Sequence, residues 1–171
     1  MIRVASWFLL VPFALAACSD SPHAHAPMEA SAPEIRLEGD PAAVELMKAV
    51  RAATARFNST TQALKAGYAP DDFCVPEMGF HWLNESLVDP VFDPMKPEVV
   101  IYAHDANGRL KLVAVEYVVI DVGQPQPAFA GRAFDVGGTP VPVPHWSQHV
   151  WLYEGNPDGA LTAFNPAISC S

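Results

Sequence analysis

The chain has 171 residues and a formal net charge of −9, with only ten Lys and Arg residues. Binding to nucleic acid depends on clustered cations that neutralise phosphates, so this charge argues against a nucleic-acid-binding function. Half of the residues are apolar, which excludes an intrinsically disordered chain, and the length suits about one folded domain. The 17 prolines favour loops and short strands over long helices.

Residues 1–17 have the pattern of a leader sequence. Arg3 supplies a positive charge, the apolar stretch over 4–15 is short for a membrane span, and Leu-Ala-Ala precedes Cys18. This pattern resembles a bacterial lipoprotein signal, which is cut before the cysteine. The resemblance implies that Cys18 carries fatty acyl chains such as palmitate, which anchor the domain to a membrane. An ordinary secretory leader cut near Ala17 and an uncleaved anchor are the alternatives.

A lipidated Cys18 predicts an extracytoplasmic domain in the bacterial cell envelope. Ser19 resembles the residue that sorts enteric lipoproteins to the outer membrane, which implies the periplasmic face of that membrane. Residues 18–40 are rich in Ala, Pro, Ser and Glu and lack periodicity, so they predict a flexible tether. Within the tether, His23 and His25 could chelate a metal weakly, and a linker without further function is the alternative.

Cys74 and Cys170 remain once Cys18 is assigned to the lipid. An even pair of cysteines outside the cytoplasm predicts a disulfide. The bond would tie the end of the chain to the segment after the first helix, and closing so long a loop could stabilise the fold by up to about 5 kcal/mol. A catalytic thiol at Cys74 is the alternative, which an oxidising compartment disfavours.

One amphipathic helix is predicted over residues 40–66. Asp40 followed by Pro41 has the pattern of a helix N-cap with proline at the first helical position. Gly67 is typical of a helix end, and the weak helix formers around Asn58 allow a kink or a break. Apolar residues and threonines recur at intervals of three and four, at Val44, Met47, Val50, Thr54, Phe57, Thr61, Leu64 and Tyr68.

An antiparallel sheet is predicted from residue 98 onward, after an irregular segment over 71–97. Strands over 99–103 and 110–120 flank an Asn-Gly turn, which is typical of a hairpin. The second strand is apolar on both faces, which predicts a central position in the sheet. Its acidic residue, Glu116, would need a partner or a proton in such surroundings. Strict alternation predicts one face made of Leu112, Ala114, Glu116, Val118 and Ile120, and the other of Val113, Val115, Tyr117 and Val119.

The last third of the chain is predicted to complete the sheet. A long loop over 121–144 is expected to insert apolar side chains into the core, at Phe129, Phe134 and Val136. A strand is predicted over 145–153 and a short one near 161–164. The pattern predicts an α+β domain over residues 41–171, in which one N-terminal amphipathic helix packs on an antiparallel sheet of four to five strands with long irregular loops.

His81, Glu116, His145 and His149 are the candidate metal ligands. His145 and His149 share a face of the predicted late strand, because residues separated by an even number do so. Imidazole and carboxylate groups bind zinc, copper and iron, so these side chains predict a transition-metal site, in which Met78 would favour copper. The alternative is a buried polar network, in which Glu116 accepts a hydrogen bond from a ring nitrogen of His145 or His149.

Aromatic residues suggest a pocket for an apolar ligand, since such pockets combine rings with a few polar groups. Packing in the core is the alternative use of the same rings. No Gly-rich phosphate loop, serine elbow or Cys-x-x-Cys motif occurs in the sequence, so no catalytic residue is assigned. The rings that could line the pocket are Phe80, Trp82, Tyr117, Trp146 and Trp151.

From about Gly67 to the end, the chain resembles an exported bacterial protein family of unknown function. The resemblance implies a secreted or lipidated single domain in which the four candidate ligands recur in matching motifs, and it implies no activity. The motifs are Gly67-Tyr68, Cys74-Val75-Pro76, Met78-Gly79-Phe80-His81, Val115-Glu116-Tyr117, His149-Val150-Trp151-Leu152-Tyr153, Asn156-Pro157-Asp158-Gly159 and Phe164-Asn165-Pro166 with Cys170.

Three hypotheses about function follow from these observations. The first is a lipid-anchored envelope protein that binds a transition metal, copper or zinc, or a small ligand through its His and Glu cluster. The second is a structural or protein-interaction lipoprotein in which the same residues form a satisfied polar network. The third is a metal-dependent enzyme in which the ion activates water and Glu116 acts as the base.

Overall fold

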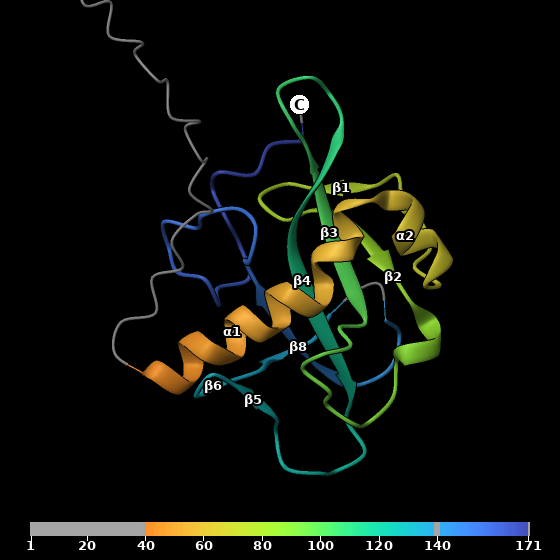
Figure 1. The fold of residues 1–171 in the computed structure, drawn as a ribbon. Helices are drawn as coiled ribbons and strands as arrows, with labels where there is room; N and C mark the ends of the chain where they lie inside the picture. The colour runs from red at the N-terminus through yellow and green to blue at the C-terminus, as the bar shows by residue number, and fades with distance from the viewer. Residues whose placement is uncertain (1–39, 139–140, 171) are drawn as a thin grey trace, which may run out of the picture. The chain divides into compact units, whose positions relative to one another are not determined.

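The computed structural model describes residues 40–138 and 141–170. The predictions for the leader, the lipidated Cys18 and the tether before Asp40 lie outside the described residues. The described chain has helices at its start and a mainly antiparallel β-structure after them, as the α+β prediction requires (Figure 1). Among the helices described, none combines the length and the apolar character needed to cross a bilayer.

The predicted single helix is interrupted. Helix α1 (Pro41–Thr54) is followed by the 3-10 turn η1 (Ala55–Asn58) and by the short helix α2 (Thr60–Lys65). Asp40 caps α1 as predicted, since its side chain accepts a hydrogen bond of 2.9 Å from the amide of Ala42. The break lies at Ser59, whose backbone is extended, while the Asn58 side chain bonds back to the Ala55 carbonyl.

The main sheet has six strands in the order β1-β2-β3-β4-β8-β7, one more than the upper limit of the prediction. Every pairing within it is antiparallel. Three of these strands were not predicted. The prediction of an irregular segment over 71–97 is wrong at β1 and at the five-residue β2, and the two-residue strands β1 and β7 carry too little alternation to be recognised in a sequence. The strands are β1 (Cys74–Val75), β2 (Gly79–Leu83), β3 (Val99–His104), β4 (Leu110–Ile120), β7 (Asp135–Val136) and β8 (His145–Val150).

Besides the N-terminal helices, three short elements of the described chain lie outside this sheet. Strands β5 (Ala128–Phe129) and β6 (Arg132–Ala133) pair with each other, and the 3-10 turn η2 (Glu85–Leu87) follows β2. The loop that holds β5 and β6 inserts Phe129 and Phe134 into the core, as predicted. Val136 is 79% exposed, so its predicted place in the core is wrong.

A β-bulge divides the pairing of β3 with β4. Ile101 pairs with Ala114 whereas Tyr102 pairs with Leu112, so Val113 is the extra residue. Leu112 therefore packs into one apolar cluster, and Val113 joins Ala114 in the other. The predicted face assignment is wrong at Leu112 and Val113, because strict alternation cannot account for an inserted residue.

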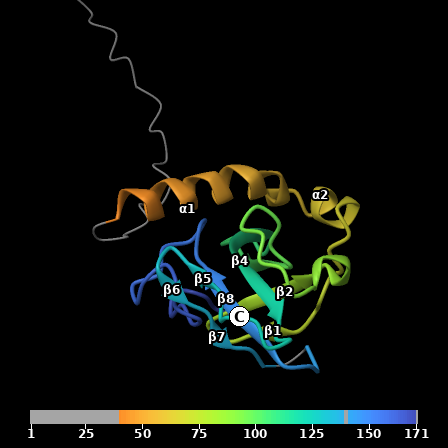
Figure 2. The ribbon, with the colours of Figure 1, turned by 90° about the horizontal axis from the view of Figure 1, so that it is seen from below.

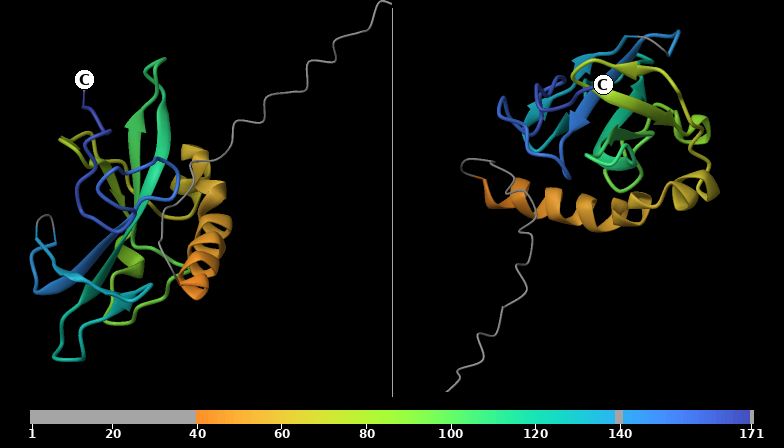
Figure 3. Two further views of the ribbon diagram at one scale, coloured as in Figure 1. Left: turned by 90° about the vertical axis from the view of Figure 1, so that its left-hand side faces the viewer. Right: turned by 90° about the horizontal axis from the view of Figure 1, so that it is seen from above.

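Two apolar clusters lie on opposite faces of the sheet. The larger cluster joins Met47 and Val50 of α1 to strand residues such as Tyr102, and α1 runs along this face (Figures 2 and 3). The smaller cluster includes Val118 and, from the C-terminal segment, Ile168. We call the face opposite α1 the far face, and the C-terminal segment lies on this side (Figure 3).

The C-terminal segment has no strand near residues 161–164, so that prediction is wrong. Its backbone groups bond instead to side chains: the Thr162 hydroxyl and the Asn156 amide both donate to the Phe164 carbonyl. The late strand β8 also ends at Val150 rather than at Tyr153, since the amide of Trp151 bonds to the Ala160 carbonyl outside the sheet. Local side-chain hydrogen bonds compete with sheet pairing in this segment.

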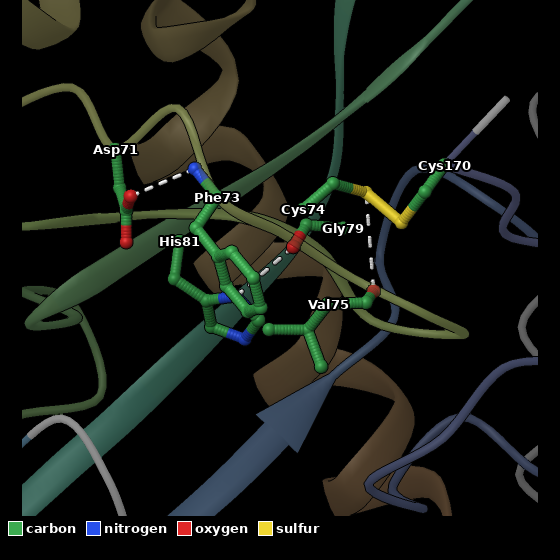
Figure 4. Close-up of a disulfide and its surroundings, with 7 residues drawn as sticks. All are labelled: Asp71, Phe73, Cys74, Val75, Gly79, His81 and Cys170. Atoms are coloured by element: carbon green, nitrogen blue, oxygen red, sulfur yellow. Dashed lines mark hydrogen bonds between the residues drawn. A yellow bond between two sulfur atoms is a disulfide. The ribbon is translucent and has the colours of Figure 1, made fainter.

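The predicted disulfide between Cys74 and Cys170 is present (Figure 4). It joins β1 at the edge of the sheet to the C-terminal segment across 96 residues of sequence. A covalent link over so long a loop removes much of the freedom of the unfolded chain.

Replacing both cysteines, as Cys74→Ser with Cys170→Ser, should lower the free energy of unfolding by about 2–5 kcal/mol. Urea unfolding followed by tryptophan fluorescence measures this loss. The wild-type protein treated with a reductant is the control and should unfold at the same urea concentration as the double variant. Unchanged unfolding of the double variant would show that the bond contributes nothing to stability.

Glu98 is a buried carboxyl group that precedes β3 and is 2% exposed. Its carboxyl oxygen accepts a hydrogen bond of 2.9 Å from the amide of Val118. The pKa of Glu98 is raised from 4.5 to about 8; burial is the main cause, the amide of Val118 opposes it, and the nearby carboxyl groups of Asp89 and Glu116 add to it. The folded protein therefore binds this proton more tightly than the unfolded chain does.

The stability that this proton contributes is complete below pH 4.5 and is lost as the pH rises to about 8. Glu98→Gln keeps an acceptor for the Val118 amide but does not ionise, so the variant should lack this loss. Thermal unfolding at a series of pH values measures the difference between the two proteins, which should reach about 2–4 kcal/mol near pH 8. Parallel pH profiles for wild type and variant would contradict the assignment.

Candidate functional site

Three of the four predicted ligands meet on the far face. His81 comes from β2, Glu116 from β4 and His149 from β8, and each offers one ligand atom within 4.8 Å of the others. The Nε2 atoms of His81 and His149 are 3.3 Å apart. The Glu116 carboxylate oxygens lie 3.8 Å from His81 Nε2 and 3.8 Å from His149 Nδ1.

Curvature of the sheet brings these residues together. Strands β3 and β4 separate β2 from β8, so a flat sheet would hold β2 and β8 about 14 Å apart with parallel side chains. Contact between the imidazoles of His81 and His149 at 3.3 Å requires the far face to be concave. The pairing of Glu116 with His149 across β4 and β8 places the carboxyl group between the two strands that carry the rings.

Neighbouring polar groups support two members of the cluster. The Nδ1 atom of His81 lies 3.2 Å from the Gly79 carbonyl oxygen (Figure 4). A proton on Nδ1 satisfies this bond and leaves the lone pair of Nε2 facing the cluster, which is the usual arrangement for a histidine that binds metal. The side chain of Ser147 favours the ionised form of Glu116 and so lowers its pKa against the effect of burial.

Burial shifts the pKa of each residue in the cluster toward its uncharged form. Burial lowers the pKa of His149 to about 4, and burial is also the main cause that lowers the pKa of His81. Burial raises the pKa of Glu116 against the opposing effect of His81. Neutral imidazole and ionised carboxylate are the forms that coordinate a metal ion.

His145 does not join the cluster, although it shares the face of β8 with His149. Four residues along a strand span about 13 Å, which is too far for both rings to reach one ion without bending the strand. The His145 Nδ1 atom lies 2.8 Å from the Val143 carbonyl oxygen, and the ring packs against Gly137. His145 therefore lines the same cavity at a separate position.

A cavity of about 430 Å³ opens in front of the cluster. Its floor is the far face, and its walls come from the β1–β2 segment, from β7 and the residues after it, and from the C-terminal segment. The predicted aromatic lining is wrong, since Trp82 and Tyr117 belong to the core on the helix side. Among the described residues, aliphatic side chains and one ring supply the walls: Val75, Met78, Val136, Val141, Ala163 and Phe164.

Two contributors to the site carried no signal in the sequence. Asp135 lines the cavity from β7 and pairs with Arg132 at 3.0 Å, but β7 has only two residues and follows no clear pattern. Gly79 has a φ of +99°, and a Cβ there would meet the Tyr102 carbonyl oxygen at 2.4 Å. No pattern in the sequence indicates that β3 approaches this closely.

Comparisons with protein-family models, with curated proteins and with solved structures returned no match for this chain. The resemblance to an exported bacterial family therefore stays a prediction. The residues that meet in space are the basis for a functional proposal, because function depends on the chemistry of a site rather than on the fold that carries it.

Gly79→Ala should destabilise the fold and displace the carbonyl that orients His81, because both the positive φ and the contact with Tyr102 oppose a side chain. The free energy of unfolding should fall by about 3 kcal/mol. Gly108→Ala is the matched control: its φ is also positive, at +73°, but no atom lies within 4 Å of the added carbon. The control should lose only about 1 kcal/mol in urea unfolding, and equal losses would refute the steric argument.

Proposed function

We propose that this protein binds one divalent first-row transition-metal ion through His81, Glu116 and His149. The observation that supports this proposal most strongly is the 3.3 Å distance between the two Nε2 atoms. Tetrahedral coordination with bonds of about 2.0–2.1 Å separates ligand atoms by about 3.3–3.4 Å. The Glu116 oxygen that lies 3.8 Å from His81 Nε2 would need to move toward that atom by about 0.5 Å to fit the same geometry.

The chemistry of the ligands favours a metal of intermediate softness. Two imidazoles and one carboxylate are the ligand set of many zinc and iron sites, whereas magnesium and calcium prefer oxygen ligands alone. Met78 also lines the cavity, and its thioether would add affinity for copper. We use zinc as the reference ion, because it has no redox chemistry and accepts this set in tetrahedral geometry.

A satisfied polar network without metal is the second candidate function for the cluster. The same 3.3 Å contact supports it, since His149 Nε2–H can donate to the unprotonated Nε2 of His81. In that case the three residues specify how the strands meet and bind nothing. The enzyme hypothesis loses its base in the metal-bound state, because a Glu116 that coordinates the ion is not free to accept a proton from water.

We also propose that the protein acts in the cell envelope, held to a membrane by acyl chains on Cys18. The leader pattern before Cys18 supports this location. The Cys74–Cys170 disulfide supports it independently, since such bonds persist mainly in oxidising compartments. Mass spectrometry of the mature N-terminus tests the proposal, and an unmodified Cys18 would contradict it.

The metal proposal predicts one equivalent of zinc per chain in isothermal titration of protein stripped with a chelator. His81→Gln, Glu116→Gln and His149→Gln should each weaken binding by more than about 100-fold, because loss of even an outer hydrogen-bond partner costs about 10–100-fold. Glutamine is close in size to both residue types and limits the damage to packing.

His104→Gln is the matched control, because His104 is an exposed histidine at the end of β3 and outside the cluster. The control variant should bind zinc as the wild type does. Circular dichroism of each variant shows whether it remains folded. A folded wild type that takes up no zinc would leave the polar network as the function of the cluster, and zinc uptake unchanged in His149→Gln would place the ion elsewhere.

A further inference from the structure

We infer that the cavity in front of the cluster binds a small apolar monocarboxylic acid, whose carboxylate occupies the open position of the metal ion. This inference rests on the proposed metal site and names its ligand class. Three protein ligands leave a tetrahedral ion with one free position. The cavity of about 430 Å³ is in the size range of small-molecule pockets.

The walls of the cavity suit an apolar body. Val75 and Met78 line it beside β1 and β2, and Phe164 lines it from the C-terminal segment. Two lining residues remain unusually exposed for their type, since Val136 is 79% and Phe164 is 53% exposed. Exposed apolar side chains grouped around a cavity indicate a surface that a ligand covers.

The charges of the cavity suit an anion with a single charge. None of the described residues that line it is Lys or Arg, and the nearby Arg132 is engaged by Asp135 and Gln148. A divalent ion bound by one ionised Glu116 would keep one net positive charge. A monocarboxylate balances that charge, whereas a phosphate dianion would exceed it and would find no cation in the walls.

One disulfide and one hydrogen bond hold two of the cavity walls in place before a ligand binds. The Cys74–Cys170 bond links the β1 edge to the chain end, and the amide of Asn165 donates to the Glu77 carbonyl at 2.8 Å. These two links fix the segment that carries Phe164 against the segment that carries Val75 and Met78. A preformed cavity loses less entropy when it binds a ligand.

The test is isothermal titration of butanoate, hexanoate and octanoate into zinc-loaded and zinc-free protein, with inorganic phosphate as the comparison anion. Binding should require zinc, and affinity should rise by about 3–4-fold for each added methylene until the cavity is filled. Phosphate should bind more weakly than hexanoate.

Substitutions at two exposed residues distinguish the contribution of the cavity walls from that of the metal ion. Phe164→Ser and Val136→Ser should weaken octanoate binding by at least about fivefold while zinc affinity stays unchanged. Val122→Ser is the matched control, because Val122 is 68% exposed and lies outside the cavity lining, and it should change neither affinity.

Each contrary outcome overturns a distinct statement. Failure of the protein to bind zinc would overturn the metal site and this inference together. Zinc uptake without carboxylate binding, or carboxylate binding that is equal without zinc, would overturn this inference alone. Affinity independent of chain length would show that the walls do not hold an apolar body.

Discussion

The far face buries polar side chains that have no oppositely charged partner, and this constraint determines the chemistry of the site. Two imidazoles and one carboxyl group lie against each other there, and no basic residue among the described lining of the cavity compensates the acid. Burial costs less when the groups are neutral, so the pKa values of His81 and His149 fall and that of Glu116 rises. A cation would supply the charge that this arrangement lacks.

The architecture of the sheet creates this constraint. The helices cover one face, which leaves the far face to be covered by loops and by the C-terminal segment (Figure 3). Because three strand spacings separate His81 from His149, the rings can meet only over a curved sheet. Bulges increase twist and bend the strand that carries them, and the bulge at Val113 lies on the long central strand β4.

Much of the fold could be predicted from local patterns in the sequence. The cap at Asp40, the hairpin around the Asn-Gly turn and the disulfide all follow from short-range rules, and each is confirmed. The wrong predictions involve features that local patterns do not contain. Because of the bulge, Leu112 and Val113 lie on the faces opposite to those predicted. Residues 161–164 form side-chain hydrogen bonds and not the predicted strand.

In the candidate site as well, the residue types could be predicted from the sequence, whereas their positions in space could not. The residue types of His81, Glu116 and His149 indicated a ligand set, but their convergence required the curvature of the sheet, which no local pattern encodes. His145 was grouped with His149 by face alone, and the length of four residues along β8 separates them. The aromatic residues were assigned to a pocket by type, whereas the bulky rings of Trp82 and Tyr117 fill the larger core.

The link between β1 and the chain end makes assembly of the cavity sensitive to the redox environment. While Cys74 and Cys170 are still thiols, the segments that carry Val75 and Phe164 are connected only by weak bonds such as that from Asn165 to Glu77. A newly made chain in a reducing compartment would therefore lack two fixed walls around His81. Oxidation of the two thiols would then complete the cavity by fixing these walls in place.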